Sequence, residues 1–380
     1  MSMLNQHPVY RKELSGGTLT VTPTGGSSSL DALFDIAERR NPKRAFLFVS
    51  KVLGRHIPIA PSVMRSAYRQ LALQIPADLP QPVLFIGMAE TAVGLGAGVF
   101  DEALRFFTDS VYLTSTRHPI DGDLLCEFKE NHSHATDHLL YQPADPILRA
   151  RVLNARSLVL IDDEATTGNT FINLLAALHA DAGLSQVEQV VTVTLTDWSG
   201  NAINDQCPLP VTPVSLVQGD WHWEKKPDAL VPIMPNVNVT THGSVAITGK
   251  QSWGRLGMSI SARDLGTKIT VSAGEKVLVL GSGEFVWEPL LLAERLEQRG
   301  AVVKFSSTTR SPISIGYAIE SAIVFTDNYG LGIPNFVYNV AHQQFDRILL
   351  CVETPAASVD PLLLDALKRV APRVDVVVYE

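Results

Sequence analysis

The sequence predicts an α/β protein with a largely parallel sheet covered by helices and a second, smaller α/β unit. Short apolar runs alternate with helical patterns from about residue 45 to residue 195. The alternation stops in a stretch rich in Pro, Gly, Trp and Asn, and it returns from about residue 265 to the C-terminus. Such alternation is typical of parallel sheets with helices on both faces.

The first unit is predicted over residues 30–220. The preceding residues 1–29 end in "TPTGGSSSL", which cannot pack a core on its own. A helix is predicted over 29–44, with Ser29 as its N-cap and Pro42 closing it. Apolar runs predict buried strands at 45–50, 82–87, 110–114, 157–162 and 190–195. Helical spacing predicts helices at 60–74, 90–106 and 169–183.

The second unit is predicted over residues 265–380, after a connector at 221–264. The residues beyond Leu195 lack clear periodicity and predict a connector or an irregular layer. In the second unit, strands are predicted within 275–285, 301–311, 347–354 and 373–380. Helices are predicted at 289–300, where Gly300 is the C-terminal cap, and at 360–371.

Composition limits the classes of function. The chain has 380 residues and a net charge of -8, which offers no basic excess for displacing counterions from nucleic acid. Its three cysteines are far apart in sequence, which fits a reducing cytoplasm. It has no run of about eighteen apolar residues and no apolar signal region at its start. We expect a cytoplasmic protein with small-molecule substrates and no membrane or nucleic-acid partner; a homodimer stays open.

The stretch "LVLIDDEATTGNTF", residues 158–171, carries the clearest chemical pattern. A buried strand ends on Asp162 and Asp163, and a turn containing Gly168 leads into a helix. Ligands of parallel sheets bind at the carboxyl ends of strands, and converging N–H groups at a helix start can hold a phosphate. The two carboxylates suit the cis hydroxyls of a ribose. The alternative is an aspartate that caps a helix, with threonines filling a turn.

This segment resembles the phosphoribosyl-pyrophosphate (PRPP) signature of type I phosphoribosyltransferases. The resemblance implies the parallel-sheet fold of that family, with PRPP as co-substrate and Mg²⁺ as cofactor. Asp162 and Asp163 would take the ribose hydroxyls and face Mg²⁺ through water or through PRPP. The 5′-phosphate would be held by the loop residues Ala165, Thr166, Thr167, Gly168, Asn169 and Thr170.

Two upstream segments fit the same resemblance. The turn after the strand at 82–87 would hold pyrophosphate through Ala89, Glu90 and Thr91, and in this family it can contain a non-proline cis peptide bond. A glycine-rich contact between helix and strand is the alternative. The long polar segment 114–143 would be a mobile loop, whose cations Arg117, His118 and Lys129 could neutralise the leaving pyrophosphate.

Other polar residues leave alternatives open. Three histidines of that loop suggest a zinc site, or instead hydrogen bonds to the acceptor or to pyrophosphate: His132, His134 and His138. The cluster Lys51, Arg55 and His56 follows a buried strand, and it either recognises the acceptor or is a solvated basic loop.

The C-terminal unit contains Thr309, Arg310, Ser311 and Pro312, together with "GSGEF" (281–285), "YNV" (338–340) and "VET" (352–354). It resembles the TRSP domain that follows a divergent phosphoribosyltransferase in bacterial tellurium-resistance gene clusters. Arg310 beside hydroxyls suggests a site for an anion or phosphorylated ligand. The glycines alone fit a structural turn equally well, and without a third glycine they are weak support for an NAD-linked oxidoreductase.

The sequence therefore favours a phosphoribosyltransferase, a glycosyltransferase that moves 5-phosphoribosyl from PRPP to an unidentified acceptor and releases pyrophosphate. The resemblance implies a nucleotide-like metabolite pathway linked to stress or tellurium resistance. The alternative is a regulatory protein that senses PRPP or a nucleotide without turnover.

Overall fold

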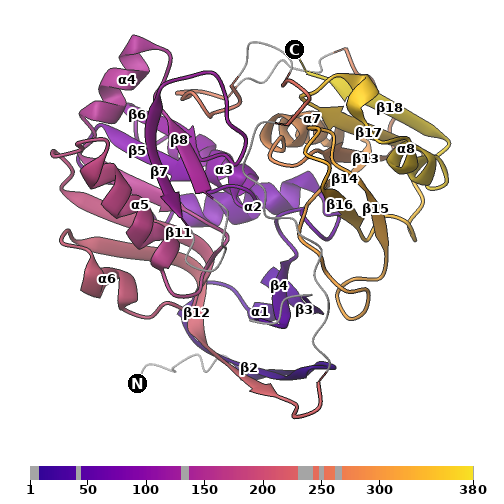
Figure 1. Cartoon of the computed structure of the whole chain (residues 1–380), viewed down its shortest axis with the longest axis horizontal. Helices are drawn as coiled ribbons and strands as arrows, with labels where there is room; N and C mark the ends of the chain where they lie inside the picture. Colours follow the sequence, from indigo (N-terminus) through magenta and orange to yellow (C-terminus); the bar gives the residue numbers. More distant parts are fainter. Residues whose placement is uncertain are drawn as a thin grey trace.

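The structure is a computed structural model that describes residues 8–39, 44–129, 137–229, 243–247, 252–261 and 268–379. It has a mixed α/β fold with a mostly parallel central sheet and a second α/β unit (Figure 1). Neighbouring strands of the eight-stranded central sheet are, in order, β1 (Tyr10–Glu13), β2 (Gly17–Gly26), β12 (Val211–Lys225), β11 (Gln189–Asp197), β9 (Ser157–Ile161), β5 (Val83–Gly87) and β6 (Ser110–Thr114), and the short β10 (Glu164–Ala165) pairs with β11.

The centre of this sheet confirms the predicted parallel arrangement. Strands β12, β11, β9, β5 and β6 run parallel, whereas β1 and β2 are antiparallel additions at one edge. Every residue of β5, β6 and β9 is buried, which explains their continuous apolar sequences. The helices of this unit are α2 (Pro61–Ala72), α3 (Val93–Ala103), α4 (Pro146–Leu153), α5 (Asn169–Ala180) and α6 (Ala202–Gln206).

The second unit is built around a parallel four-stranded sheet. Its strands, in spatial order, are β14 (Val302–Ser307), β13 (Lys276–Gly281), β17 (Arg347–Val352) and β18 (Arg373–Val378). The remaining elements are α7 (Trp287–Gln298), the 3₁₀ turn η1 (Ala356–Ser358), α8 (Pro361–Lys368) and the antiparallel pair β15 (Ala322–Thr326) and β16 (Pro334–Tyr338). Gly300 follows α7 with a φ of 94°, as expected of a C-terminal cap. Helices α2 and α3 of the first unit both contact α7, and they lie between the two sheets in Figure 1.

The helix predicted over 29–44 is wrong. Among the described residues of that range, only α1 (Leu30–Leu33) is helical, and β3 (Phe34–Glu38) follows at once and pairs antiparallel with β4 (Phe46–Ser50). The pairing buries both Phe34 and Ile36 against the core. Aromatic and β-branched side chains favour such a strand, and cross-strand packing outweighs the helical spacing.

Strands also occur where the sequence predicts none. Strands β1 and β2 lie within residues 1–29, and the 15-residue β12 continues the central sheet beyond Leu195. Strand β2 pairs along β12, with a bulge between Gln218 and Gly219, so a distant partner compensates for weak local patterns. The segment predicted as a mobile loop contains an antiparallel pair, β7 (Leu124–Lys129) and β8 (Asp137–Tyr141). None of the described helices is long and apolar enough to cross a membrane.

Candidate functional site

The acidic pair lies at the carboxyl end of β9, next to the central strand β11. Asp162 donates its backbone N–H to Val193 O at 3.0 Å, and Leu195 N–H donates to Asp163 O at 3.1 Å. Both side chains are only partly buried. The backbone is therefore fixed in the sheet while the carboxylates stand at its edge, the position at which ligands of parallel sheets bind.

Gly168 begins helix α5 in the left-handed conformation. Its φ is 76°, and a Cβ built on it would lie 2.3 Å from Cγ1 of Ile203. Only glycine satisfies both the conformation and the space. The predicted loop therefore exists as a tight turn into a 12-residue helix, which supports a phosphate cradle at the helix start.

Arg44 is a residue near this loop that sequence reasoning missed. It forms an ion pair of 2.8 Å with Glu164, and its Nη1 lies 3.4 Å from the Oγ1 of Thr166. Its guanidinium also lies 4.7 Å from the ring centroid of Phe46. No local motif marks Arg44, because its polar partners are more than a hundred residues away in sequence.

The turn after β5 is held from the neighbouring strand. Ala89 donates its backbone N–H to the hydroxyl of Ser115 at 2.9 Å, and that hydroxyl is 3.0 Å from Nδ1 of His138. The peptide bond between Ala89 and Glu90 is cis, as the resemblance implies. His138 is fully buried and stacks on Phe128, with ring centroids 4.7 Å apart. It therefore supports the turn, whereas His132 and His134 lie outside the described residues.

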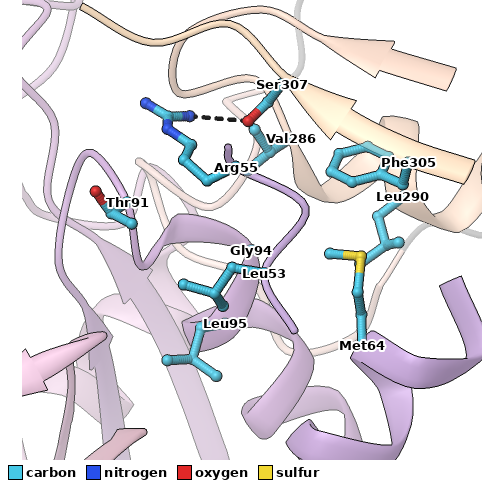
Figure 2. A pocket seen from close by; sticks show the side chains of 10 residues that line it. All are labelled: Leu53, Arg55, Met64, Thr91, Gly94, Leu95, Val286, Leu290, Phe305 and Ser307. Atoms are coloured by element: carbon cyan, nitrogen blue, oxygen red, sulfur yellow. Dashed lines mark hydrogen bonds between the residues drawn. The ribbon is translucent and has the colours of Figure 1, made fainter. Parts of the chain in front are cut away.

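Glu90, on the same turn, forms ion pairs with two arginines from distant parts of the chain. Its Oε1 forms a short ion pair with Nη2 of Arg55, and its Oε2 accepts a 2.9 Å hydrogen bond from Nε of Arg310. Arg55 also donates to the carbonyl of Gly283 at 2.6 Å. It donates to the hydroxyl of Ser307 at 3.2 Å, as Figure 2 shows. The turn predicted to bind pyrophosphate thus lies against the second unit.

The turn that carries Arg310 is braced by hydrogen bonds. Ser311 donates its N–H to the hydroxyl of Thr309 at 3.1 Å. The hydroxyl of Tyr338 donates to Ser311 O and accepts from Ile313 N–H, both at 2.8 Å. The two sequence motifs "TRSP" and "YNV" are therefore partners in space, and together they present Arg310 to the first unit.

A second contact joins the units through Glu284, which is 4% exposed. This carboxylate accepts hydrogen bonds from the hydroxyl of Thr116 at 2.6 Å and from the backbone N–H of Arg117 at 2.7 Å. Burial alone would raise its pKa, but His118, Arg255 and these hydrogen bonds lower the pKa of Glu284 to about 2. Glu284 is thus ionised at neutral pH and fixes the start of the loop after β6.

Behind Glu284 is a buried polar network. Arg255 forms two hydrogen bonds of 2.8 Å with Glu353, and the hydroxyl of Tyr329 donates to the same carboxylate at 2.7 Å. The ring of Tyr329 stacks on His118 of the first unit, with centroids 4.2 Å apart. Burial lowers the pKa of His118, and the charge of Glu284 opposes this shift.

These contacts bring the carboxyl ends of the two sheets together. Residues that follow β5 and β6 meet residues that follow β13 and β14. Burial lowers the pKa of Arg55 to about 9, and the charges of Glu284 and Asp163 oppose this shift. Arg55 is therefore a buried cation with charged groups of both units near it.

A small cavity lies beside Arg55 between the two units (Figure 2). Its lining includes Thr91 of the turn after β5 and, from the second unit, Val286 and Ser307. Most of the other lining side chains are apolar. Of the residues predicted for pyrophosphate, Thr91 is thus the one that faces this cavity.

Three of the predicted basic residues make other contacts. Lys51 donates to Asp31 O at 2.9 Å. Burial and the nearby Arg55 lower the pKa of His56 to about 3, so its ring is neutral and packs at 5.8 Å from the ring of Tyr338. Lys129, at the end of β7, is exposed, and its carbonyl accepts a hydrogen bond of 2.7 Å from Asn173 on α5.

The donor set suits a hard cation shared with a ligand. In the described part of the chain, no group of three or more His, Cys, Asp or Glu side chains is arranged to hold a metal ion. Asp162 and Asp163 are two adjacent carboxylates at a strand end. Mg²⁺ prefers oxygen ligands and commonly completes its shell with water and substrate phosphates, so these residues fit it.

Family models match most of the chain. Residues 33–220 match a model described as phosphoribosyl transferase, and residues 252–367 match one described as a TRSP domain C-terminal to that transferase. No curated protein matches the sequence.

Solved structures show distant likenesses to the first unit. The chain is similar to adenine phosphoribosyltransferase from Leishmania donovani (12% identity, 51% of this chain and 86% of that one, TM-score 0.35). It is similar to an APRTase from Giardia lamblia complexed with 9-deazaadenine (16% identity, 51% and 98%, TM-score 0.34). A third is orotate phosphoribosyltransferase from Aeropyrum pernix (17% identity, 46% and 80%, TM-score 0.28).

Proposed function

We propose that this chain transfers 5-phosphoribosyl from PRPP to an acceptor. Its residues 33–220 belong to a phosphoribosyl transferase family, and its residues 252–367 match the TRSP domain that follows this transferase. The observation that carries the proposal is the continuous arrangement of strand β9, the two aspartates, the turn at Gly168 and helix α5. This arrangement offers adjacent groups for a diol and a phosphate. The acceptor is a small molecule, and the pathway is the nucleotide-like one, linked to stress or tellurium resistance, that the resemblance implies.

In this proposal each group of residues has a separate task. Asp162 and Asp163 hold the ribose hydroxyls, and residues 165–170 hold the 5′-phosphate through backbone N–H groups and hydroxyls. Ala89, Glu90 and Thr91 form the pyrophosphate turn. The cations placed around the leaving group are Arg117 and Arg310, and Lys129 if its loop closes.

The reaction breaks the bond between C1 of the ribose and the pyrophosphate oxygen, whose electron pair leaves with pyrophosphate. A nucleophilic atom of the acceptor, such as a ring nitrogen, forms the new bond to C1, and the proton of that nitrogen passes to solvent or to the released pyrophosphate. The protein mainly positions the reactants and stabilises the charge of the leaving group. Mg²⁺, held by Asp162 and Asp163 with PRPP, would supply further charge neutralisation.

Pyrophosphate release tests this proposal. The full chain is incubated with PRPP, Mg²⁺ and a metabolite extract, and release is compared with an Asp162→Asn/Asp163→Asn variant. The matched control is Asp181→Asn/Asp205→Asn, which changes two exposed aspartates of the same unit. We expect release by the wild type and the control and none by the active-site variant. Release that persists in that variant would exclude the site.

The same assay separates the enzyme from the alternative function. A regulatory protein that senses PRPP would bind it tightly and release no pyrophosphate with any extract. We further propose that the protein is cytoplasmic and that a homodimer, if formed, leaves this site intact. We also propose a division into units at 30–220 and 265–380 with residues 221–264 between them, although β12 runs to Lys225 and the TRSP match begins at residue 252.

A further inference from the structure

Glu90 places a negative charge on the turn that should receive pyrophosphate. A carboxylate there would repel a polyanion if it stood alone. In the structure it contacts both Arg55 and Arg310, and its side chain is 12% exposed. A carboxylate between two guanidinium groups has the shape and charge of a bound oxyanion.

The side chain of Arg55 and the backbone turn of Arg310 are held by contacts that do not involve Glu90. Arg55 is held by the carbonyl of Gly283 and the hydroxyl of Ser307, both from the second unit. Within the part of the chain that the structure describes, Nε of Arg55 is buried and has no hydrogen-bond partner. One donor of this guanidinium is therefore left for a ligand. Arg310 stands on the turn that Tyr338 and Thr309 brace.

We propose that Arg55 and Arg310 form a pyrophosphate-binding clamp shared by the two units, and that Glu90 occupies this clamp until pyrophosphate displaces it. The inference rests on the proposed function, since pyrophosphate is the group that PRPP releases. The net charge of the three side chains is positive by one, and it rises to two when the carboxylate is neutralised. Removing the charge of Glu90 should therefore tighten the binding of pyrophosphate. If Glu90 merely oriented the arginines, the same change would weaken this binding.

The chain offers a matched control on the same interface. Arg65 of α2 and Glu294 of α7 form a comparable ion pair between the units, with Nε and Oε1 2.6 Å apart. The variants Arg65→Gln and Glu294→Gln weaken the contact between the units without touching the clamp. Arg65 also pairs with Asp101 of α3 at 2.7 Å, so Glu294→Gln is the variant that reports the effect of loosened packing between the units alone.

The test is calorimetric titration of inorganic pyrophosphate, with inorganic phosphate as a second probe. For pyrophosphate, we expect Glu90→Gln to bind several-fold more tightly and Arg310→Gln about tenfold more weakly than the wild type. Arg310→Lys should recover part of the loss, and both control variants should match the wild type. Inorganic phosphate carries less charge and fewer acceptor oxygens than pyrophosphate, and it should bind more weakly than pyrophosphate to the wild type.

Several outcomes would overturn the clamp. They are unchanged or weaker binding by Glu90→Gln, wild-type affinity in Arg310→Gln, or no binding to the wild type. If Arg310→Gln does not fold, Glu90→Gln still decides, because the clamp requires tighter binding of pyrophosphate by that variant. If the wild type turns over PRPP but the variants do not show the expected changes in pyrophosphate affinity, only the clamp is excluded. If the wild type does not bind PRPP, the proposed function is excluded.

Discussion

The carboxylate of Glu284 accepts the backbone N–H of Arg117 at 2.7 Å, across the boundary between the two units. The same carboxylate accepts the hydroxyl of Thr116. A glutamate of the second unit thus sets the path of the loop that carries a proposed pyrophosphate contact. The second unit is in this way a structural part of the proposed donor site.

This relationship predicts that Glu284→Gln weakens PRPP binding. The variant keeps one oxygen but loses the charge that faces Arg255 and the loop, and hydrogen bonds to charged groups are worth about 1.5 to 3 kcal/mol. We expect the dissociation constant for PRPP to rise by about tenfold, measured by calorimetry. Glu294→Gln removes a charge from the same interface away from the loop, and it should bind PRPP as the wild type does. Equal affinities for Glu284→Gln and the wild type would refute the positioning role.

Gly168 gives a prediction for stability. Gly168→Ala should lower the free energy of unfolding by about 1 to 3 kcal/mol, because alanine is strained at this φ and its Cβ would collide with Ile203. Gly183→Ala is the control, since Gly183 also has a positive φ but no atom lies within 4 Å of the place a Cβ would take. Gly183→Ala should lower the free energy of unfolding by about 1 kcal/mol. Denaturant unfolding of both variants measures the difference, and equal losses would mean that the contact with Ile203 is unimportant.

A buried carboxyl group predicts a dependence of stability on pH. Burial raises the pKa of Glu288 to about 8, well above its value in an unfolded chain. Between about pH 5 and pH 8 the folded state then holds a proton that the unfolded state has lost, so this group makes stability fall as pH rises.

The variant Glu288→Gln removes this contribution. Between about pH 5 and pH 8 the unfolding free energy of the variant should fall less steeply with pH than that of the wild type. The two slopes should differ by on the order of 1 kcal/mol per pH unit. The comparison is made as a difference between the two proteins at each pH, which cancels the contribution of the buried His56. Parallel pH profiles would contradict the raised pKa.

The backbone of the candidate site was predictable where its parts are adjacent along the chain. Strand β9, both aspartates, Gly168 and the start of α5 occupy thirteen consecutive residues, 157–169, so the local pattern sufficed. The parallel centre of the sheet was predictable for the same reason, because buried strands have continuous apolar sequences. Strand β2 is not predicted, since it is specified by its pairing with β1 and β12 rather than by its own residues.

The contacts between the units could not be predicted in this way. Glu90 and Arg310 are 220 positions apart, and Arg55 and Gly283 are 228 apart. Each residue was noticed alone, Arg55 for the acceptor and Arg310 for a separate anion site. Their meeting depends on how one sheet faces the other, and no periodicity in a single sequence encodes that arrangement.

Every part of the proposed reaction depends on PRPP binding at the loop from Asp162 to Thr170. Calorimetric titration of the full chain with PRPP and Mg²⁺ measures this binding, and it is repeated for the Asp162→Asn/Asp163→Asn variant and for its surface control Asp181→Asn/Asp205→Asn. We predict saturable binding by the wild type and the control, and an affinity at least about tenfold weaker when both donor-site carboxylates are neutralised. Equal affinity in all three proteins, or no binding by the wild type, would refute a PRPP site at this loop.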